Sequence, residues 1–457
     1  MERMESIGGE HTGQTSSVRK VALASLVGTT IEWYDYFIYG TTAALIFNQL
    51  FFPSFEPLAG TLAAFATFAV GFFARPLGGV IFGHYGDKIG RKTMLVLTLF
   101  LMGGATFLIG LLPTVDTIGI WAPILLVTLR IVQGLGLGGE WGGAALMVSE
   151  HSPPNRRGFY ASSVQMGAAG GLVISAAAIG AVSQFTSDEQ FAAWGWRIPF
   201  LASIVLIGVG MYIRLQIEES EAFKRIKETG TEARMPIIDV FRTRTKNVIL
   251  AAGTSGANNV VFYTVSVFTV SYGVSQLGYS QSTMLWYQMI TAAVYFVTLP
   301  LFGALSDRVG RRELILACVI IMALFSFPYF WLVNTGIGPV VLLSMVLALA
   351  VFQSGAYAPQ SAFIPELFDT RVRYSGAALG YNLATMIFGG TSPFIATALF
   401  AWAGQETWAV SLYVVAICVV SFVSVYLATE TPMLSESYDE DAEQRATTSG
   451  PSREVPG

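Results

Sequence analysis

The chain alternates long apolar stretches with short polar breaks along nearly its whole length. A helix needs about 20 apolar residues to cross the hydrocarbon core of a bilayer. The pattern predicts twelve transmembrane helices, at 19–48, 60–85, 92–113, 120–148, 158–184, 196–216, 246–275, 282–305, 313–334, 338–364, 375–402 and 406–428. The one long polar break, 217–245, is rich in charge and is interpreted as a solvated linker between two six-helix halves.

These elements predict an all-α integral membrane protein with twelve transmembrane helices in two pseudo-symmetric six-helix bundles. The expected domains are an N-terminal tail, a first bundle, the linker, a second bundle and a disordered acidic tail, at 1–18, 19–216, 217–245, 246–430 and 431–457.

Composition supports a membrane protein. Of the 457 residues, 53% are hydrophobic and 12% charged, against about 25% charged in an average soluble domain. The basic residues are spread over separate loops, which argues against a nucleic-acid partner. No nucleophile and base set or metal cluster is apparent, so an enzyme is the least expected class, and no cofactor is expected. The expected partners are the lipid bilayer and a small-molecule substrate, with the chain acting as a monomer.

The positions of Lys and Arg predict the orientation. Basic clusters recur at 88–92, 156–157, 214–246, 308–312 and 371–373, always on one side of the predicted weave. Since cytoplasmic loops carry the excess of Lys and Arg, both termini and the linker are expected in the cytoplasm, and the protein in the cytoplasmic membrane of a bacterium.

One loop occurs twice. GHYGDKIGRK at 83–92 returns as GALSDRVGRR at 303–312, with Asp87 and Asp307 220 residues apart. A Glu-x6-Arg pair also recurs, as Glu150 with Arg157 and Glu366 with Arg373. Repeats of this kind are typical of carriers built from two similar halves. Positive anchoring alone would explain one basic loop, but two matched copies favour a gate that clamps helices in one state. The residues assigned to this gate are Gly83, Asp87, Arg91, Glu150, Arg157, Gly303, Asp307, Arg311, Glu366 and Arg373.

Ionisable residues inside the predicted helices are the candidates for chemistry, because charge is costly at bilayer depth. Glu32 and Asp35 lie three residues apart on one helix face. Counting from Val21, the helical rise places them roughly 16 Å and 21 Å deep, and counting from Trp121 it places Arg130 roughly 14 Å from the opposite side. All three are therefore expected near one level of the membrane.

A buried carboxyl group beside a fixed arginine is minimal equipment for coupling a proton to an anion. A carboxyl group that is removed from water can take up a proton near neutral pH, whereas an arginine stays charged and holds a carboxylate with a fork of donors. Asp35, with Glu32 as second choice, is the expected proton carrier, and Arg130 the expected substrate ligand. The alternative is a static ion-pair cluster that only joins two helices.

Polar residues elsewhere are weaker candidates for the cavity wall, with helix packing as the alternative. They are Tyr36, Gln133, Gln165, Asn258, Asn259 and Asn382. A second charged set, Arg75, Glu140 and Glu150, is expected nearer the cytoplasmic end in a structural or gating role. The positions 220 residues after Glu32 and Asp35 are uncharged, so charge coupling is expected in the N-terminal half and neutral hydrogen bonding in the C-terminal half.

At these residues the chain resembles a known family. The twelve-helix plan, the duplicated loop and the repeated Glu-x6-Arg are similar to the major facilitator superfamily over residues 19 to 430. The segments IEWYDYFIYG, RPLGG, RIVQGLGLGGEWGGA and FDTRVRYSG resemble its metabolite:proton symporter branch, starting at 31, 75, 130 and 368. The resemblance implies uptake of α-ketoglutarate, citrate, shikimate or related acids, or of proline and betaine, and it places Glu32, Asp35 and Arg130 on the branch's membrane-embedded charges.

The expected function is therefore proton-coupled import of a small organic acid by alternating access, with the proton as coupling ion. A proton symporter of a zwitterionic solute such as proline or betaine is one alternative. An exporter of metabolites or drugs is another, although an arginine at mid-depth weighs against a cationic drug. A non-transporting receptor is disfavoured, because the charged residues are kept and no soluble signalling domain is apparent.

Overall fold

The structure is a computed structural model that describes residues 2–89, 91–138, 140–216, 244–368 and 372–429. Within these ranges, the side chains outside the description are those of 2–17, 83–89, 91–93, 95, 140, 150 and 213–216. The predicted linker at 217–245 and tail at 431–457 thus fall almost entirely outside the described residues.

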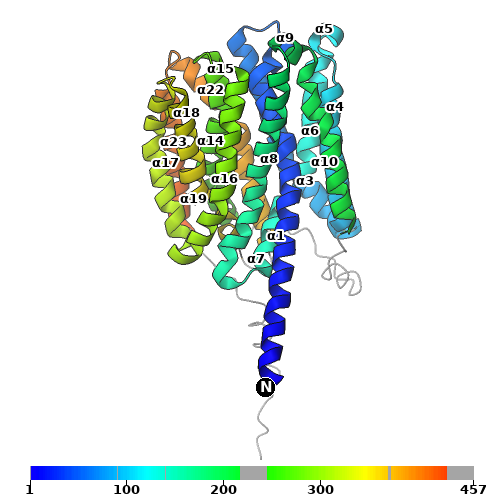
Figure 1. Ribbon diagram of the computed structural model, residues 1–457, viewed down its shortest axis with the longest axis vertical. Coiled ribbons are helices and arrows are strands. Elements are labelled where there is room, and N and C mark those ends of the chain that lie inside the picture. The colour runs from blue at the N-terminus through cyan, green and yellow to red at the C-terminus, as the bar shows by residue number, and fades with distance from the viewer. Residues whose placement is uncertain (1, 90, 139, 217–243, 369–371, 430–457) are drawn as a thin grey trace, which may run out of the picture.

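Helices that run between the two ends of a bundle make up the described part of the chain (Figure 1). In the N-terminal half the long helices are α1 (Glu2–Thr42), α3 (Pro57–Ile89), α4 (Arg91–Leu111), α6 (Trp121–Leu137), α7 (Glu140–His151), α8 (Arg157–Phe185) and α10 (Arg197–Gln216). Shorter turns connect them: η1 (Ala43–Phe47), α2 (Asn48–Phe51), α5 (Val115–Ile118), η2 (Pro154–Arg156), α9 (Asp188–Gln190) and η3 (Phe191–Gly195).

The C-terminal half repeats the plan with more interruptions. Its helices are α13 (Thr245–Thr254), α14 (Gly256–Tyr263), α15 (Thr269–Ser275), α16 (Gln281–Val309), α17 (Arg311–Val333), α18 (Gly338–Val346), α19 (Ser354–Tyr357), α20 (Gln360–Phe363), α21 (Arg373–Ala384), α22 (Ser392–Trp402) and α23 (Trp408–Leu427). The turns within these passes are η4 (Thr264–Phe268), η5 (Leu347–Gln353), η6 (Pro365–Leu367) and η7 (Thr385–Gly390).

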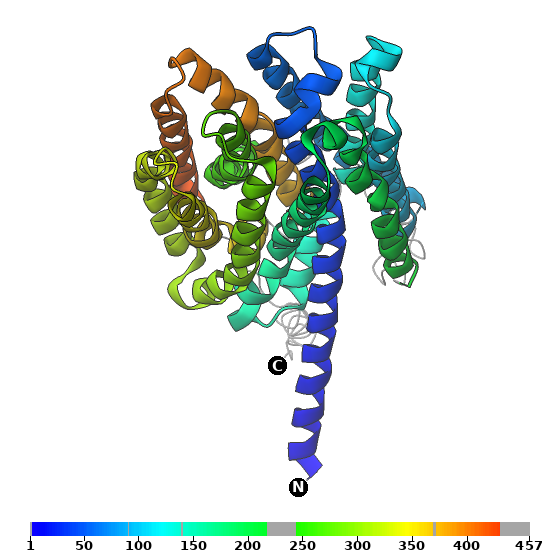
Figure 2. The ribbon, with the colours of Figure 1, turned by 45° about the horizontal axis from the view of Figure 1, so that its top comes forward.

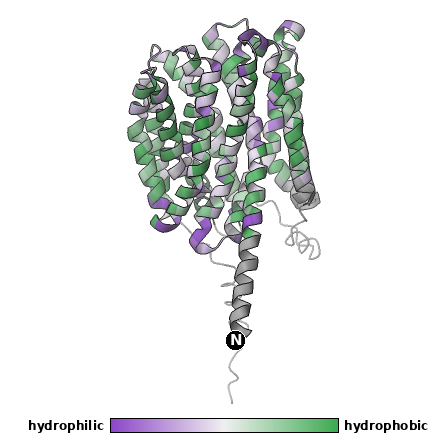
Figure 3. Ribbon diagram, in the orientation of Figure 1, coloured by the Kyte–Doolittle hydropathy of each residue, from purple (hydrophilic) through white to green (hydrophobic). Residues whose placement is uncertain are grey.

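The two halves make twelve passes, as predicted. Nine described helices are long and apolar enough to cross a membrane, and the bent pair Asp188–Gly195 with Arg197–Tyr212 makes a tenth. The other two passes are α1 and α4, whose apolar part is Val96–Leu111. Apolar residues occupy the middle of the helices, and polar residues gather at the helix ends (Figure 3). Helix α1 starts earlier than the predicted 19–48, since it runs from Glu2 and projects beyond the bundle (Figure 1).

Figure 2 shows the two groups of helices side by side, with α8 of the first half packed along α16 of the second. The pass Thr245–Ser275 is 89% buried in its most apolar stretch, so it runs through the centre. Wide helical turns interrupt the passes that contain η1, η4, η5 and η7. Such turns are frequent at functional sites, because they re-aim side chains and free backbone groups. The interrupted passes therefore indicate a functional site at the interface between the halves.

Candidate functional site

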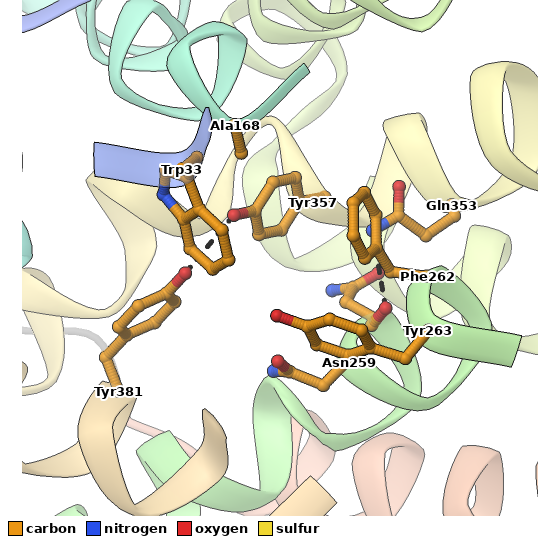
Figure 4. Close-up of a pocket in the computed structure, with 9 residues that line it drawn as sticks. Trp33, Ala168, Asn259, Phe262, Tyr263, Gln353, Tyr357 and Tyr381 are labelled. Carbon is orange, nitrogen blue, oxygen red and sulfur yellow. Dashed lines mark hydrogen bonds between the residues drawn. The ribbon is translucent and has the colours of Figure 1, made fainter. Parts of the chain in front are cut away.

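A small cavity lies between the two halves, with room for about one water molecule (Figure 4). Two of its lining residues come from the N-terminal half and seven from the C-terminal half. They are Trp33, Ala168, Asn258, Asn259, Phe262, Tyr263, Gln353, Tyr357 and Tyr381. The cavity wall is thus mostly neutral, polar and aromatic, as expected for the C-terminal half.

Several polar atoms of this wall have no partner. Both amide atoms of Asn258, the Tyr263 hydroxyl and the Gln353 Oε1 are buried without a hydrogen bond, while Gln353 Nε2 donates to the Asn258 carbonyl at 3.4 Å. A buried polar group without a partner costs about 1–3 kcal/mol, so such groups are rare in a finished core. Their gathering around one cavity suits a ligand that carries hydrogen-bonding groups.

Aromatic contacts close the cavity on both sides. Toward the end of the bundle where the chain begins, the Trp141 ring stacks on the Tyr381 ring with centroids 3.7 Å apart. Toward the opposite end, Tyr263 packs edge-on against Phe68 at 5.7 Å and Phe72 at 5.6 Å. Each contact joins one half to the other, so a ligand enters only when the halves move apart at one end.

The structure brings Asp35 and Arg130 to one buried cluster but not into an ion pair. Asp35 is 1% exposed and Arg130 is fully buried. Arg130 Nη1 donates to Gln133 Oε1, and Gln133 Nε2 donates to the Thr106 hydroxyl at 2.9 Å. Gln133 Nε2 also donates to the Asp35 backbone carbonyl at 3.4 Å, while the Asp35 Oδ1 has no partner. Gln133 therefore joins Arg130 to the Asp35 residue, and the acid and the base make no direct contact.

Arg130 is held tightly. Its Nη2 donates to the Phe68 carbonyl at 3.0 Å, and its guanidinium carbon lies 4.6 Å from the Tyr36 ring centroid and 4.0 Å from that of Tyr39. A Cβ at Gly71 would lie 2.8 Å from Arg130 Nη2, so glycine is what leaves room for the guanidinium. Arg130 does not line the central cavity, because the Tyr36 and Tyr39 rings and helix α3 enclose it.

The other predicted wall residues divide into two groups. Asn258 and Asn259 line the cavity. By contrast, Tyr36 donates to the Gly71 carbonyl at 3.1 Å, inside the N-terminal half. Gln165 Nε2 donates to the Tyr357 carbonyl at 3.4 Å, and Asn382 Nδ2 donates to the Gly138 carbonyl at 2.7 Å. Gln165 and Asn382 thus join the two halves beside the cavity. Glu32, second choice for the proton, is buried with 5% exposure.

Arg75 differs from expectation. Its guanidinium carbon lies 5.6 Å from the Trp33 ring centroid and 5.7 Å from that of Tyr36, so it reaches a wall residue of the cavity and shares a ring with Arg130. The expectation that Arg75 lies nearer the end where the chain begins was based on its Cα position alone. A helical side chain points back toward the helix N-terminus, and this carries the long arginine toward the centre of α3.

The C-terminal copy of the repeated loop contacts the N-terminal half. The Asp307 carboxylate accepts hydrogen bonds from the backbone N–H groups of Gly158 at 2.7 Å and Phe159 at 3.0 Å. These groups belong to the first turn of α8, where a negative charge is favourable. A Cβ at Gly303 would lie 2.7 Å from the Gly158 carbonyl oxygen, so the two glycines let α16 and α8 approach closely. We call the end of the bundle that carries Asp307 the basic end.

A carboxylate cluster continues this contact. Glu366 pairs with Arg311, and its Oε1 lies 3.9 Å from Arg157 Nη1 across the halves. Arg157 Nε donates to the Ser149 carbonyl at 3.1 Å and Arg373 Nε to the Phe368 carbonyl at 3.2 Å. Each repeated arginine thus bonds to the end of the preceding pass. The Glu-x6-Arg repeat therefore ties neighbouring helices through backbone carbonyls, while Glu366 itself pairs elsewhere.

The N-terminal copy of the repeated loop lies largely outside the described side chains. The side chains of Gly83, Asp87, Arg91 and Glu150 lie outside the described residues, as does that of Glu140. Trp33, which was not among the expected wall residues, lines the cavity, and Arg75 lies beside it. The available signal for Arg75 was that it is a lone basic residue within a long apolar stretch.

Comparison with known proteins agrees with this geometry. The family model of the Major Facilitator Superfamily matches residues 25–390. The shikimate transporter of Escherichia coli K12 is 42% identical over 421 residues, covering 92% of this chain and 96% of that protein. The proline/betaine transporter of the same organism is 34% identical, covering 91% and 84%. Among solved structures, a D-xylose-proton symporter superposes with a TM-score of 0.69 at 19% identity, over 90% of this chain and 97% of that one, which shows a shared fold.

These relatives are transporters, and the match spans both halves and the cavity between them. The chain is accordingly a multi-pass membrane transporter rather than an enzyme. Twelve passes in two bundles, a cavity at their interface and a duplicated loop all agree with the family match, and the protein belongs to the major facilitator superfamily, in its metabolite:proton symporter branch.

Proposed function

We propose that this protein imports a small organic acid together with one or more protons, by alternating access across the cytoplasmic membrane of a bacterium. The observation that carries the proposal is Asp35, a residue with 1% exposure whose backbone carbonyl accepts from Gln133, the side chain that also accepts from the fixed Arg130. The 42% identity to a shikimate transporter supports a carboxylate as the substrate.

The coupling rests on charge. With Asp35 ionised, its charge offsets that of Arg130 within a dry core. Protonation removes the negative charge and turns the carboxyl group into a hydrogen-bond donor. The centre then carries an uncompensated positive charge, and an anionic substrate offsets it. Proton and anion thus favour each other's binding, which is the thermodynamic requirement for symport.

Alternating access follows from the contacts between halves. The basic end, which the Lys and Arg distribution places in the cytoplasm, is held shut by Asp307 on the first turn of α8 and by the Glu366 pairs. Aromatic contacts of Tyr263 with Phe68 and Phe72 cover the cavity on the other side. Release of one set while the other holds exposes the cavity to one side of the membrane at a time.

Transport in proteoliposomes tests the coupling. Wild-type protein is expected to accumulate radiolabelled shikimate when an inward proton gradient is imposed. Asp35→Asn is expected to abolish accumulation while sparing exchange of internal for external shikimate, because the neutral amide imitates the protonated carboxyl group. Asp116→Asn, at an exposed position, is the matched control and is expected to accumulate normally. Wild-type accumulation that ignores the gradient, or normal accumulation by Asp35→Asn, contradicts the proposed coupling.

A zwitterionic solute is the second candidate, since the proline/betaine transporter covers 91% of the chain at 34% identity. Competition discriminates between the two. For an organic-acid carrier, excess unlabelled shikimate inhibits uptake of labelled shikimate and excess glycine betaine does not. Gradient-driven uptake of betaine without uptake of shikimate would show that the substrate is the zwitterionic solute.

A further inference from the structure

Arg75 is a buried cation that pairs with no acid among the side chains that the structure describes. It lies on α3 with 1% exposure, and its Nε and Nη1 have no hydrogen-bond partner. Removing an ion from water without a partner costs several kcal/mol. Since no described side chain supplies an anion, an anion from outside suits this position.

Three aromatic rings hold this guanidinium in place. Its central carbon lies 5.6 Å from the Trp33 ring centroid and 5.7 Å from the centroids of Tyr36 and Phe72. Ring faces attract a cation without using its N–H groups. The cage therefore fixes the position of Arg75 and leaves its donors available, which is the arrangement that a carboxylate-binding fork needs.

Arg130, the other buried arginine of the cluster, is differently equipped. Its Nη1 and Nη2 donate to Gln133 and to the Phe68 carbonyl, so only Nε is left without a partner. It is linked by hydrogen bonds toward Asp35 and is separated from the cavity by aromatic rings. The two arginines flank Tyr36, but only Arg75 keeps most of its fork unoccupied.

Arg75 also borders the cavity. Trp33 belongs both to its aromatic cage and to the cavity wall. Phe72 of the cage packs edge-on against Tyr263 of the wall, with ring centroids 5.6 Å apart. The unpartnered groups of Asn258, Tyr263 and Gln353 belong to the same wall, on the C-terminal half (Figure 4). A positive fork thus stands on one half and neutral donors and acceptors on the other.

From this arrangement we infer that Arg75 is the ligand for the substrate carboxylate, and that Asn258, Tyr263 and Gln353 bind uncharged hydroxyl or carbonyl groups at the far end of the same molecule. The inference rests on the proposed function and narrows it to a hydroxylated monocarboxylate. Arg130 then belongs to the proton-coupling cluster and makes no contact with substrate. A substrate that carries a cationic group is disfavoured, since Arg75 fills the cage and the described lining of the cavity contains no acid.

A binding experiment with a matched pair of ligands tests the assignment. Shikimate, a hydroxylated cyclic carboxylate, and its methyl ester share the ring and hydroxyls but differ in charge. Binding to purified protein in nanodiscs is measured by isothermal titration calorimetry. Wild type is expected to prefer the acid by at least about 30-fold, the scale for losing one partner of a buried charge pair. Arg75→Gln is expected to reduce that preference to within about threefold, chiefly by weakening the acid.

Two further variants separate the roles. Asn258→Ala is expected to weaken acid and ester by the same factor, because it removes a contact to the shared part of both ligands. Arg130→Gln removes a charge that attracts the anion without touching it, so it is expected to weaken the preference for the acid much less than Arg75→Gln does. Retention of the full preference in Arg75→Gln, or its loss in Arg130→Gln, overturns the assignment while the proposed function stands. Failure of the wild type to bind the acid in preference to the ester overturns both.

The melting temperature of the ligand-free protein guards against a folding defect. Because Arg75 is an unpaired buried charge, Arg75→Gln is expected to leave the melting temperature unchanged or to raise it. A structural arginine that holds helices together would instead lower it on substitution. A fall of more than about 5 °C, the effect of roughly 1 kcal/mol or more in a domain, contradicts the assignment.

Discussion

The contact of Asp307 with α8 makes a quantitative prediction about how the basic end opens. The carboxylate accepts two backbone hydrogen bonds, from Gly158 at 2.7 Å and Phe159 at 3.0 Å. In Asp307→Asn one oxygen remains as an acceptor, but the amide nitrogen faces an N–H donor and the charge is lost. A hydrogen bond to a charged group is worth about 1.5–3 kcal/mol. We expect the closed state to lose about 2–3 kcal/mol, which is roughly a 30- to 150-fold shift toward opening.

Double electron–electron resonance measures this shift. Spin labels at Arg156, before α8, and at Leu427, at the end of α23, report the separation of the halves, since both positions are exposed and lie toward the basic end. Asp307→Asn is expected to move the distance distribution toward longer values. Asp188→Asn, an exposed acid at the opposite end of the bundle, is the control and is expected to leave it unchanged. Identical distributions for Asp307→Asn and wild type would refute the clamping role of this contact.

Three further substitutions probe the packing around the site. Gly71→Ala places a methyl group 2.8 Å from Arg130 Nη2. The overpacking is expected to cost about 1–3 kcal/mol and to lower the melting temperature of the protein in detergent. Gly208→Ala, which meets no atom within 4 Å, is the control and is expected to leave the melting temperature unchanged. Glu366→Gln removes the anion that Arg157 and Arg311 share, although Arg311 keeps Asp307 at 3.7 Å. Breaking a buried pair costs up to about 3–5 kcal/mol, so an unchanged melting temperature would argue against the pairing. Trp141→Ala removes the stack between halves, worth about 0.5–1.5 kcal/mol beyond its buried area, and faster hydrogen exchange in α7 is the expected result.

The residues of the predicted coupling site could be identified from the sequence, but their contacts could not. Charge within an apolar stretch singled out Asp35 and Arg130, and the helical rise placed them near one level. Their connection was not predictable in detail, because whether two side chains meet depends on rotamers and on the residues between them. Gln133 occupies that space: it accepts from Arg130 Nη1 and donates to the Thr106 hydroxyl and the Asp35 backbone carbonyl.

The position of the Arg75 guanidinium could not be predicted by counting residues along the helix axis. Its Cα position suggested a gating role, whereas its guanidinium lies in an aromatic cage beside the cavity. A long side chain shifts its charge by more than a helical turn, in a direction set by the helix polarity. Linear sequence carries the polarity but not the neighbouring rings that hold the guanidinium.

The gate illustrates the same division. The repeated loop singled out Asp307, Arg311 and Glu366, but the repeat suggested that Glu366 acts with Arg373 of its own half. In the structure Glu366 pairs with Arg311 and lies near Arg157 of the other half. In the described part of the chain, hydrogen bonds between the halves join residues from 148 to 244 positions apart, and nothing local in the chain specifies them.

The sequence by itself determined the membrane class, the twelve passes, the duplication and the separation of charge into the N-terminal half. Those features follow from local composition and spacing, because the bilayer requires apolar helices of set length and makes each buried charge exceptional. Only the tertiary structure decided which buried charge faces the cavity. That outcome depends on how the two bundles face each other, which leaves Arg130 enclosed by rings and carbonyls and Arg75 beside a wall of unpartnered polar groups.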